Sequence, residues 1–373
     1  MSAAETNVMQ LPPAEARHAE DLATLAAWDD GPRPPGWRLT PRAVVTFIVG
    51  SGGEKIRGRV ITEKFVGDRA LVERCVVTLC GSRGLMLVGE PGTAKSMLSE
   101  LLSAAVSGTS ALTVQGTAGT TEDQLRYGWN YALLIARGPS PEALVPSPVL
   151  QAMRSGAVVR IEEITRCLPE VQDALVSVLS ERALAVPELG GGHLEAARPG
   201  FNLIATANLR DRGVSEMSAA LKRRFNFETV PPIADLAREQ ALVRAQATAS
   251  LAQVGLPFTL DDAVLEALVT VFSDLRNGRT VEGWAVEKPA AVLSTAEAVS
   301  VAAALGFQTA WFRSDRDVLS LLPGYLLGVV LKDDPKDRGR LLAYWDGAVK
   351  RRADGTARLW KQLHALRGVL EGA

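Results

Sequence analysis

A phosphate-binding loop motif constrains what this 373-residue chain can fold into more than any other feature. An unbroken apolar run at residues 85–88 leads into a segment that fits the pattern G-x-x-x-x-G-K-[ST]. The eight residues of the segment are Gly89, Glu90, Pro91, Gly92, Thr93, Ala94, Lys95 and Ser96. The one departure is Ala94, where a second glycine is usual, and apolar residues at helical spacing follow. The order is therefore buried strand, loop and helix.

The chemistry of such a loop follows from its backbone. Successive N–H groups and the positive end of the following helix point at one place, where a chain of phosphates can bind. Lys95 would reach the β- and γ-phosphates, and the Ser96 hydroxyl would bind Mg²⁺. We therefore predict that the chain binds a nucleoside triphosphate. The alternative is a strand-to-helix turn with a chance Lys-Ser pair, which the flanking pattern disfavours.

The composition is that of an ordinary globular chain, long enough for two or three domains of about 150 residues. Apolar residues make up 47% of the chain, charged residues make up 22%, and the net charge is −1. A chain so close to neutral has no general attraction for nucleic acid or anionic membranes. No apolar run is long enough to span a bilayer, and the first 30 residues lack the apolar core of a secretory signal.

The cysteine and histidine usage favours a cytoplasmic protein with reduced thiols. Cys75, Cys80 and Cys167 are odd in number and form no C-x-x-C pair. The three histidines are far apart in the sequence, which argues against a histidine metal site.

A strand that ends in two acidic residues is the second informative feature. Residues 157–161 are apolar except for Arg160, and Glu162 and Glu163 follow directly. Beside a phosphate loop, the first carboxylate would hold the metal shell, and the second would orient or deprotonate the attacking water. Glu162 stands where aspartate is usual, and its extra methylene still allows it to reach a metal-bound water. Alternatively, the two acids only complement the dipole of a following helix.

Two more polar signals follow along the chain. The buried strand expected at 201–208 ends in Asn208, which could position water or respond to the γ-phosphate. An asparagine at a strand end is also a common turn former. Residues 217–225 end a helix with several cations. Among them, Arg224 could act as an arginine finger on the nucleotide of a neighbouring subunit, or the cations could only complement the helix dipole.

Periodicity predicts an α/β core followed by helices. Strands are expected at 85–88, 111–115, 157–163, 201–208 and 227–230. Core helices are expected at 14–28, 41–49, 69–80, 97–105, 149–153 and 169–182, with a hairpin at 183–195. Residues 116–150 form a long irregular segment, which in a compact domain is usually functional. Later helices are expected at 233–254, 260–275, 294–312, 315–331 and 337–370.

The last predicted helix carries a row of cations. They are Lys350, Arg351, Arg352, Arg358, Lys361 and Arg367. We interpret this row as a solvated or subunit-contact face, because the sparse interleaving of aromatic residues makes a nucleic-acid site unlikely.

Taken in order, these stretches resemble the AAA+ ATPases, and within them the MoxR-type branch. The resemblance covers about residues 55–330 and rests on the stretches at 89–96, 162–175, 204–208 and 221–225. It implies a P-loop core with a five-stranded parallel sheet between helices, and an all-α C-terminal lid. It also implies an insertion in the second helix at 116–150 and a hairpin before the sensor strand. The implied domains are an N-terminal extension or linker (1–40), an ATPase core (41–231) and a lid with C-terminal helices (232–373).

The resemblance also implies roles for single residues. Glu162 would be the Walker B metal-site acid, Glu163 the catalytic base and Asn208 the first sensor. Arg224 would be the finger that acts on the next subunit's nucleotide, with Arg223 as a neighbouring candidate.

Three further residues concern the base and the lid. Val66 and Gly67 lie where the family contacts the adenine. Ala296 stands where family members usually carry the second-sensor arginine, through which the lid responds to the γ-phosphate.

The motifs and the resemblance favour a cytoplasmic ATPase that hydrolyses ATP to ADP and phosphate with Mg²⁺. It would form a homo-oligomeric ring, expected to be a hexamer, and remodel a protein client. MoxR-type proteins are typically chaperones, often with a partner that carries a von Willebrand A domain.

Two alternatives stay open. The first is a nucleotide-dependent assembly scaffold with little turnover, suggested by Glu162, Arg160 and Ala296. The second is a nucleic-acid motor or GTP-driven restriction subunit, because residues 208–213 and 223–225 have similar forms there. The near-zero charge and the lack of a recognisable DNA-binding module argue against the second.

Overall fold

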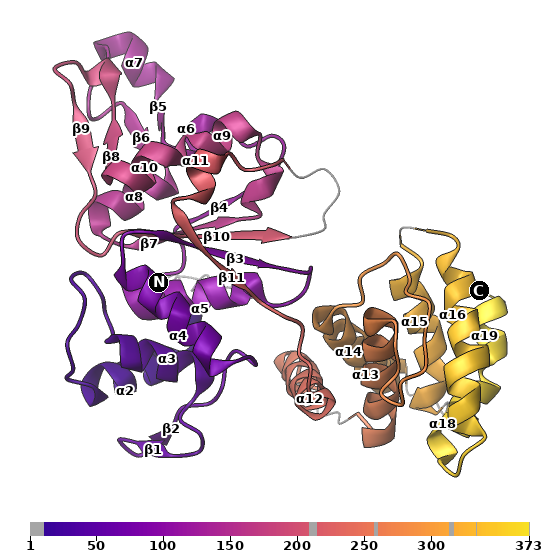
Figure 1. The fold of residues 1–373 in the computed structure, drawn as a ribbon. Helices are drawn as coiled ribbons and strands as arrows, with labels where there is room; N and C mark the ends of the chain where they lie inside the picture. The colour runs from indigo at the N-terminus through magenta and orange to yellow at the C-terminus, as the bar shows by residue number, and fades with distance from the viewer. Residues whose placement is uncertain (1–10, 209–214, 257–259, 313–316, 333, 373) are drawn as a thin grey trace, which may run out of the picture. The chain divides into compact units, whose positions relative to one another are not determined.

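The computed structural model describes residues 11–208, 215–256, 260–312, 317–332 and 334–372 (Figure 1). The chain divides into two compact units. The first consists of Met1–Glu90 and Ala94–Val230, and the second consists of Pro91–Thr93 and Pro231–Ala373. Residues 209–213, which suggested a restriction-type motor, lie outside the described residues.

A five-stranded parallel sheet forms the centre of the first unit, in the order β11-β3-β10-β7-β4. The strands are β3 (Gly84–Gly89), β4 (Thr113–Gln115), β7 (Val158–Glu162), β10 (Asn202–Asn208) and β11 (Phe225–Thr229). Every residue of β3 is buried, as is all of β10 except its last residue. Continuous burial is expected of central parallel strands covered on both faces. The predicted five-stranded parallel core is confirmed.

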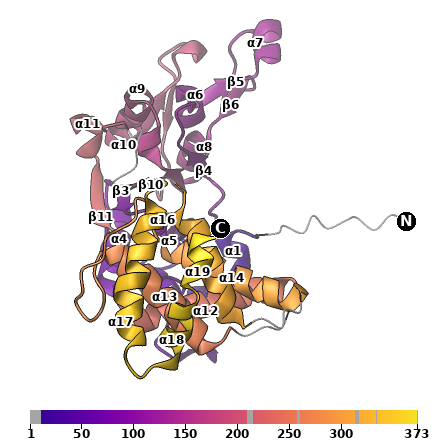
Figure 2. The same ribbon diagram turned by 90° about the vertical axis from the view of Figure 1, so that its right-hand side faces the viewer.

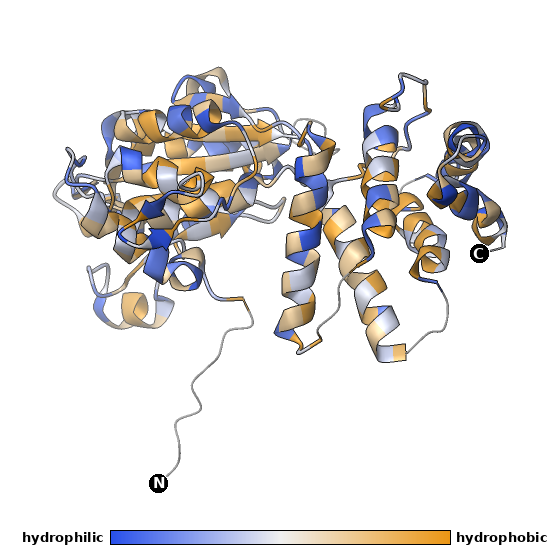
Figure 3. Cartoon of the chain, turned by 90° about the horizontal axis from the view of Figure 1, so that it is seen from below, coloured by the Kyte–Doolittle hydropathy of each residue, from blue (hydrophilic) through white to orange (hydrophobic). Residues whose placement is uncertain are grey.

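Helices cover both faces of this sheet. They include α3 (Pro41–Val49), α4 (Arg69–Cys80), α5 (Lys95–Ser107), α8 (Pro148–Ser155), α9 (Pro169–Asp173), α10 (Leu175–Glu181) and α11 (Ala219–Lys222). Leu85 and Leu87 pack with α3, α4 and α5, whereas Met86 and Val88 pack with α8 and α10. Side chains of a strand alternate between faces, so β3 contributes to both cores. In Figure 3 the strands of this sheet are mostly orange, the colour of apolar residues.

Most core helices begin and end where the sequence predicts. Thr40 caps α3 by accepting a hydrogen bond from the Ala43 N–H, and Asp68 caps α4 in the same way. The helix expected at 169–182 is instead two helices, because the chain turns at Ala174 between α9 and α10.

The described part of residues 1–40 also packs on the first unit. It contains α1 (Ala14–Arg17) and α2 (Ala19–Trp28). Ala14, Leu25, Trp37 and Leu39 are buried in the same core as α3, α4 and α5. A short hairpin of β1 (Lys55–Ile56) and β2 (Arg59–Val60) follows α3.

Two small excursions leave the central sheet. Residues 116–150, which periodicity left unassigned, contain α6 (Glu122–Leu125), β5 (Tyr127–Trp129), α7 (Tyr131–Arg137) and β6 (Leu144–Pro146). β5 and β6 pair antiparallel, and so do β8 (Ala183–Ala185) and β9 (Leu194–Ala196). The second pair confirms the predicted hairpin, whose connection includes η2 (Pro187–Leu189).

Helices make up the second unit, with one isolated β-bridge in the part that the structure describes. Figure 2 labels α12 (Leu236–Gln253), α13 (Asp262–Asn277), α14 (Thr295–Phe312), α16 (Asp337–Tyr344), α17 (Lys350–Ala353), α18 (Arg358–Ala365) and α19 (Arg367–Glu371). The unit also contains η3 (Val318–Leu321), α15 (Leu322–Val330) and η4 (Trp345–Val349). The prediction of one helix over 337–370 is wrong. A π-helical turn interrupts it at η4, and the chain leaves the helix at Asp354 and Gly355, two residues that disfavour helix interiors.

The predicted basic face on this segment is also wrong in part. Arg352 is buried, and its guanidinium donates to Asp274 and Glu282. Arg367 pairs with Asp346 and Glu371. These two cations therefore have partners within the chain.

Two features of the composition can be compared with the structure. None of the helices in the described residues is both long enough and apolar enough to cross a bilayer. All three cysteines are free, Cys75 and Cys167 are buried, and Cys80 is exposed. Burial raises the pKa of Cys75 to about 12, so this thiol is unreactive at neutral pH.

Candidate nucleotide site

The loop between β3 and α5 has the strained backbone of a tight phosphate-binding turn. Gly92 and Ala94 have φ values of 75° and 63°, both in the left-handed region. Glycine adopts this conformation freely, whereas for alanine it costs about 1 kcal/mol. Lys95 begins α5 and is only 7% exposed, and its Nζ donates to the carbonyls of Gly89 (3.2 Å) and Glu90 (2.7 Å). The predicted lysine therefore lies over the first half of the loop.

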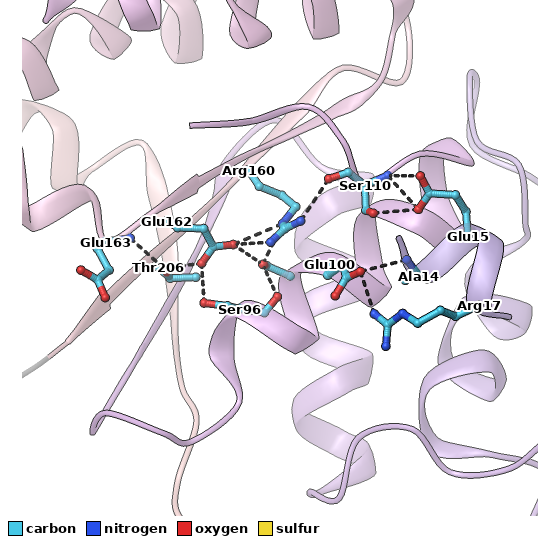
Figure 4. A network of polar contacts seen from close by, with 11 residues as sticks. Ala14, Glu15, Arg17, Ser96, Glu100, Ser110, Arg160, Glu162, Glu163 and Thr206 are labelled. Carbon is cyan, nitrogen blue, oxygen red and sulfur yellow. Dashed lines mark hydrogen bonds and ion pairs between the residues drawn. The ribbon is translucent and has the colours of Figure 1, made fainter. Parts of the chain in front are cut away.

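Four side chains surround the carboxylate of Glu162 at the end of β7 (Figure 4). Ser96 donates to Oε2 at 2.7 Å, and Thr206 donates to the same oxygen at 2.8 Å. Ser99 donates to Oε1 at 2.6 Å, and Arg160 donates to it at 2.8 Å. Glu162 is 6% exposed, so nearly all its polar contacts are with protein.

The electrostatic balance at Glu162 favours the charged form. Burial alone raises the pKa of a carboxyl group, because the ion loses water. Here the hydrogen bonds from Ser99 and Ser96, the charge of Arg160 and the hydrogen bond from Thr206 outweigh burial. The pKa of Glu162 therefore lies below its ordinary value of 4.5, and the group is a carboxylate at neutral pH.

Glu163 follows in a left-handed conformation (φ 53°) that turns the chain out of the strand. Its N–H donates to Thr206 Oγ1 at 2.9 Å, and its Oε2 lies 2.5 Å from Arg166 Nε. Gly116 approaches this turn so closely that a Cβ on it would lie 2.4 Å from the Glu163 carbonyl oxygen, which only glycine allows. Strained non-glycine residues concentrate at functional sites.

A cavity of about 320 Å³ opens beside Glu163. Its lining residues are Gln115, Gly116, Thr117, Ala118, Glu163 and Arg166. The carboxyl group proposed as a base therefore borders open space next to the end of β4.

The register of the sheet brings the predicted polar residues to one edge. Asn208 lies opposite Gly89 across the β10–β3 pair, and Gln115 lies opposite Glu162 across β4–β7. In a parallel sheet all carboxyl ends meet at the same edge, where ligands of such folds bind. Lys95, Ser96, Glu162, Glu163 and Asn208 therefore belong to one site.

The two candidate finger residues are placed apart from this edge, after α11. Arg224 is half-buried, and it donates to Ser180 Oγ and to the Ala220 carbonyl, both at 2.7 Å. Arg223 caps the end of α11 and is exposed.

The residues predicted at the adenine and in the lid lie in different units. Val66 and Gly67 are half-buried just before α4. A Cβ on Gly67 would lie 2.3 Å from the Phe65 ring, so a larger residue there would require that ring to move. Ala296 is in the first turn of α14, in the second unit.

Sequence reasoning missed Ser99, Thr206 and Arg166 as members of this site. Ser99 is three residues after Ser96 and so shares its helix face, and Thr206 is two residues before Asn208 and so shares its strand face. These spacings are the signals that could have identified both. Arg166 carries no such signal, because its contact depends on the turn at Glu163.

The oxygen donors at the site suit Mg²⁺, a hard cation that prefers hydroxyl, carboxylate and phosphate oxygens. Ser96 and Glu162 present one hydroxyl and one carboxylate 2.7 Å apart. The described residues contain no group of three or more His, Cys, Asp or Glu that could hold a metal. A magnesium ion here would therefore take most of its other ligands from phosphate and water.

Comparisons with known proteins show the family to which the chain belongs. Residues 84–225 match the AAA domain of the dynein-related subfamily, and residues 237–371 match the YehL-like AAA+ ATPase C-terminal domain. The uncharacterized protein YehL of Escherichia coli (strain K12) is 51% identical over 348 residues, which are 92% of this chain and 94% of that protein. This chain belongs to the YehL-like AAA+ ATPases. The finer assignment to the MoxR-type branch stays a prediction.

Other matches to this YehL-like chain have lower sequence identity. An uncharacterized protein of Staphylococcus haemolyticus (strain JCSC1435) is 30% identical over 52% of this chain and 69% of its own length. Among solved structures, NtrX from Brucella abortus in complex with ADP has a TM-score of 0.47 at 16% identity, over 83% of this chain and 69% of that chain. The same protein in complex with ATP has a TM-score of 0.48 at 15% identity, over 84% and 70%.

Proposed function

We propose that this YehL-like chain is a magnesium-dependent ATPase that hydrolyses ATP to ADP and phosphate. The observation that carries the proposal is the meeting of five predicted residues at one sheet edge. A P-loop with a buried lysine lies beside a serine–carboxylate pair, and a second acid and an asparagine follow on the neighbouring strands. The family match supports the same conclusion.

Each residue then has a role set by its place. The loop N–H groups from Gly89 to Ser96 and the Lys95 ammonium would bind the β- and γ-phosphates. Ser96 and Glu162 would hold Mg²⁺, which neutralises phosphate charge when bound. Glu163, on its strained turn beside the cavity, would orient or deprotonate the attacking water, and Asn208 would position that water.

The finger would come from a neighbouring copy in a homo-oligomeric ring, which we expect to be a hexamer. Arg224 remains our first candidate, although its contacts to Ser180 and Ala220 would have to break for it to reach a neighbour. The exposed Arg223 could reach a neighbour without that cost. A guanidinium in either position would stabilise charge on the transferred phosphoryl group.

The remaining assignments follow from the resemblance. Val66 and Gly67 would contact the adenine, residues 41–231 would form the ATPase core, and residues 232–373 would form the lid and C-terminal helices. Residues 1–40 would be an N-terminal extension. The ring would act in the cytoplasm as a chaperone of the MoxR type on a protein client, with a von Willebrand A domain protein as a possible partner.

A scaffold with little turnover is the second candidate, and two contacts favour it. Arg166 engages the carboxylate of Glu163, and Arg160 engages that of Glu162. If these pairs persist with nucleotide bound, ATP would stabilise the ring without rapid hydrolysis.

Steady-state turnover of purified protein separates the two candidates. Under the ATPase proposal, Glu163→Gln lowers turnover by about a hundredfold or more, because the water loses its base, while ATP binding persists. Exposed Glu188→Gln on the hairpin connection is the matched control and keeps full turnover. Two results together would favour the scaffold. The wild-type chain would turn over ATP no faster than Glu163→Gln, and rings would form in ATP and not in ADP.

A further inference from the structure

Arg160 is a charged residue in the middle of a buried strand, where sequence alone makes it an irregularity. It lies two residues before Glu162 on β7, so both side chains project from the same face of the sheet. Its side chain is 12% exposed. A guanidinium this buried needs partners for its N–H groups, because unpaired charge in the interior is costly.

The guanidinium finds three different partners around Glu162 (Figure 4). Nη2 and Nε donate to Glu162 Oε1 at 2.8 and 3.2 Å. Nε also lies 3.1 Å from Ser99 Oγ, and Nη1 donates to the Ser110 carbonyl at 3.0 Å. A planar fork with this many fixed donors leaves little freedom to the carboxylate that it holds.

The two carboxylate oxygens of Glu162 accept hydrogen bonds from different donors. Oε1 accepts hydrogen bonds from Arg160 and Ser99. Oε2 receives Ser96, the hydroxyl proposed to bind Mg²⁺, and Thr206. By occupying Oε1, Arg160 orients Oε2 toward the place where the metal shell would form.

Arg160 is itself held by a segment far away in the sequence. The Ser110 N–H and hydroxyl donate to Glu15 of α1, at 3.1 and 2.7 Å. Glu100 of α5 accepts from Ala14 and Arg17 on the same short helix, at 2.8 and 2.7 Å. The N-terminal helix is therefore connected through Ser110 and Arg160 to the metal-site acid.

We propose that Arg160 is a positioning residue that fixes the Glu162 carboxylate for the magnesium–nucleotide complex. The inference rests on the proposed function, because it assigns a partner to the proposed metal-site acid. Groups that orient metal-site residues without touching the metal commonly change metal affinity by about 10–100-fold.

A simple neutralising role for Arg160 predicts the opposite effect. A nearby positive charge repels Mg²⁺, so its removal would then lower the magnesium concentration that nucleotide binding requires. If Arg160 positions the carboxylate, its removal raises that concentration. The direction of the change therefore distinguishes the two roles.

The test measures binding of a fluorescent ATP analogue to the full chain, in EDTA and over a range of Mg²⁺ concentrations. Arg160→Met removes the guanidinium at similar length, and we expect the half-saturating Mg²⁺ concentration to rise about tenfold or more. Affinity in EDTA should match wild type, because the loop that binds phosphate is intact. Arg160→Lys should fall between, since an ammonium lacks the fork that joins Glu162 to Ser110.

Two further variants make the result decisive. Ser99→Ala removes the other donor to Oε1 and should raise the magnesium requirement in the same direction, even if Arg160→Met fails to fold. Arg154→Met is the matched control, because it removes an Arg–Glu pair with Glu195, outside the set of residues that contact Glu162. We expect its magnesium requirement to equal that of wild type.

Three results bear on the inference. A magnesium requirement that is unchanged or lower in Arg160→Lys and Ser99→Ala overturns it and leaves the ATPase proposal intact. A wild-type chain that binds the analogue equally well in EDTA and in Mg²⁺ overturns the proposed metal site and the inference with it. A magnesium requirement that rises in Arg160→Lys and Ser99→Ala and equals that of wild type in Arg154→Met supports the inference.

Discussion

At the residue scale, the candidate site contains two of the four described non-glycine residues with positive φ, Ala94 and Glu163. Ala94 lies in the phosphate-loop motif immediately before α5, and Glu163 directly follows Glu162, the proposed metal-site acid at the end of β7. Both turn the chain sharply at the carboxyl edge of the sheet. Because such conformations persist only where the surrounding structure enforces them, their presence at this edge supports the proposed site there.

At this scale we predict the effect of relieving the backbone strain at Ala94. Ala94→Gly should raise the stability of the first unit by up to about 1 kcal/mol, because glycine adopts the left-handed conformation without a Cβ clash. The matched control is Ala104→Gly, in the interior of α5, the helix that follows Ala94; it should lower stability by about 1 kcal/mol or more. Urea unfolding of both variants measures the difference. Equal destabilisation by the two changes would contradict the strain at Ala94.

At the element scale, the loop between α13 and α14 is attached to α17 by an ion pair. Arg352 donates to both carboxylate oxygens of Glu282, at 2.8 and 2.7 Å, and its guanidinium lies over the Trp360 ring at 4.6 Å. The hydrogen bond from Arg352 lowers the pKa of Glu282 to about 2 from its ordinary 4.5. Burial of the neighbouring Asp274 raises the pKa of that carboxyl.

The sign of the pH dependence follows from these shifts. A carboxyl whose folded pKa is depressed contributes stability above its unfolded pKa and loses it as pH falls through the folded pKa. For Glu282 the loss runs from pH about 4.5 down to about 2. Asp274, with a raised pKa, acts in the opposite direction, so only a comparison of variants isolates Glu282.

We therefore predict that Glu282→Gln flattens the decrease in stability of the helical unit between pH 5 and pH 3. The variant should be less stable than wild type at pH 5, with the gap narrowing toward pH 3. The control is Glu287→Gln, which should keep the wild-type slope; Glu287 is an exposed residue of the same loop and pairs with Arg340 of α16. Urea midpoints followed by far-UV circular dichroism provide the measurement. A wild-type slope in Glu282→Gln would disprove the assignment.

At the scale of the whole molecule, the proposed ring places each active site between two copies. One copy supplies Glu163 and the phosphate loop, and its neighbour supplies Arg224 or Arg223. A site built in this way can be restored by mixing two inactive variants with different defects. An active site contained within one chain cannot be restored by such mixing.

The final prediction uses this property. Glu163→Gln and Arg224→Ala should each have low turnover alone, and their mixture should recover turnover, because some interfaces then combine an intact Glu163 with an intact Arg224. Arg223→Ala in place of Arg224→Ala identifies which arginine is the finger. A mixture that never exceeds the average of its two components, for both arginines, would exclude a shared site.

The sequence by itself determined the sheet and the contents of its edge. Strand, loop and helix at 85–96 are local in the chain, and apolar runs of strand length predict burial on both faces whatever else surrounds them. The loop motif predicted Lys95 and Ser96 at this edge, and Glu162, Glu163 and Asn208 were predictable there because each lies next to the end of such a run.

Only the tertiary structure decided which side chains these residues meet. Arg160 contacts Ser99 and Ser110, and Arg352 contacts Asp274 and Glu282. Spacing along the chain does not predict these partners. Burial of a charged group costs much free energy unless a specific partner is present. Which partner is present depends on how elements distant in the sequence pack. The phosphate-loop motif could thus be identified from eight consecutive residues, whereas the contacts of Glu162, the proposed metal-site acid, required the folded chain.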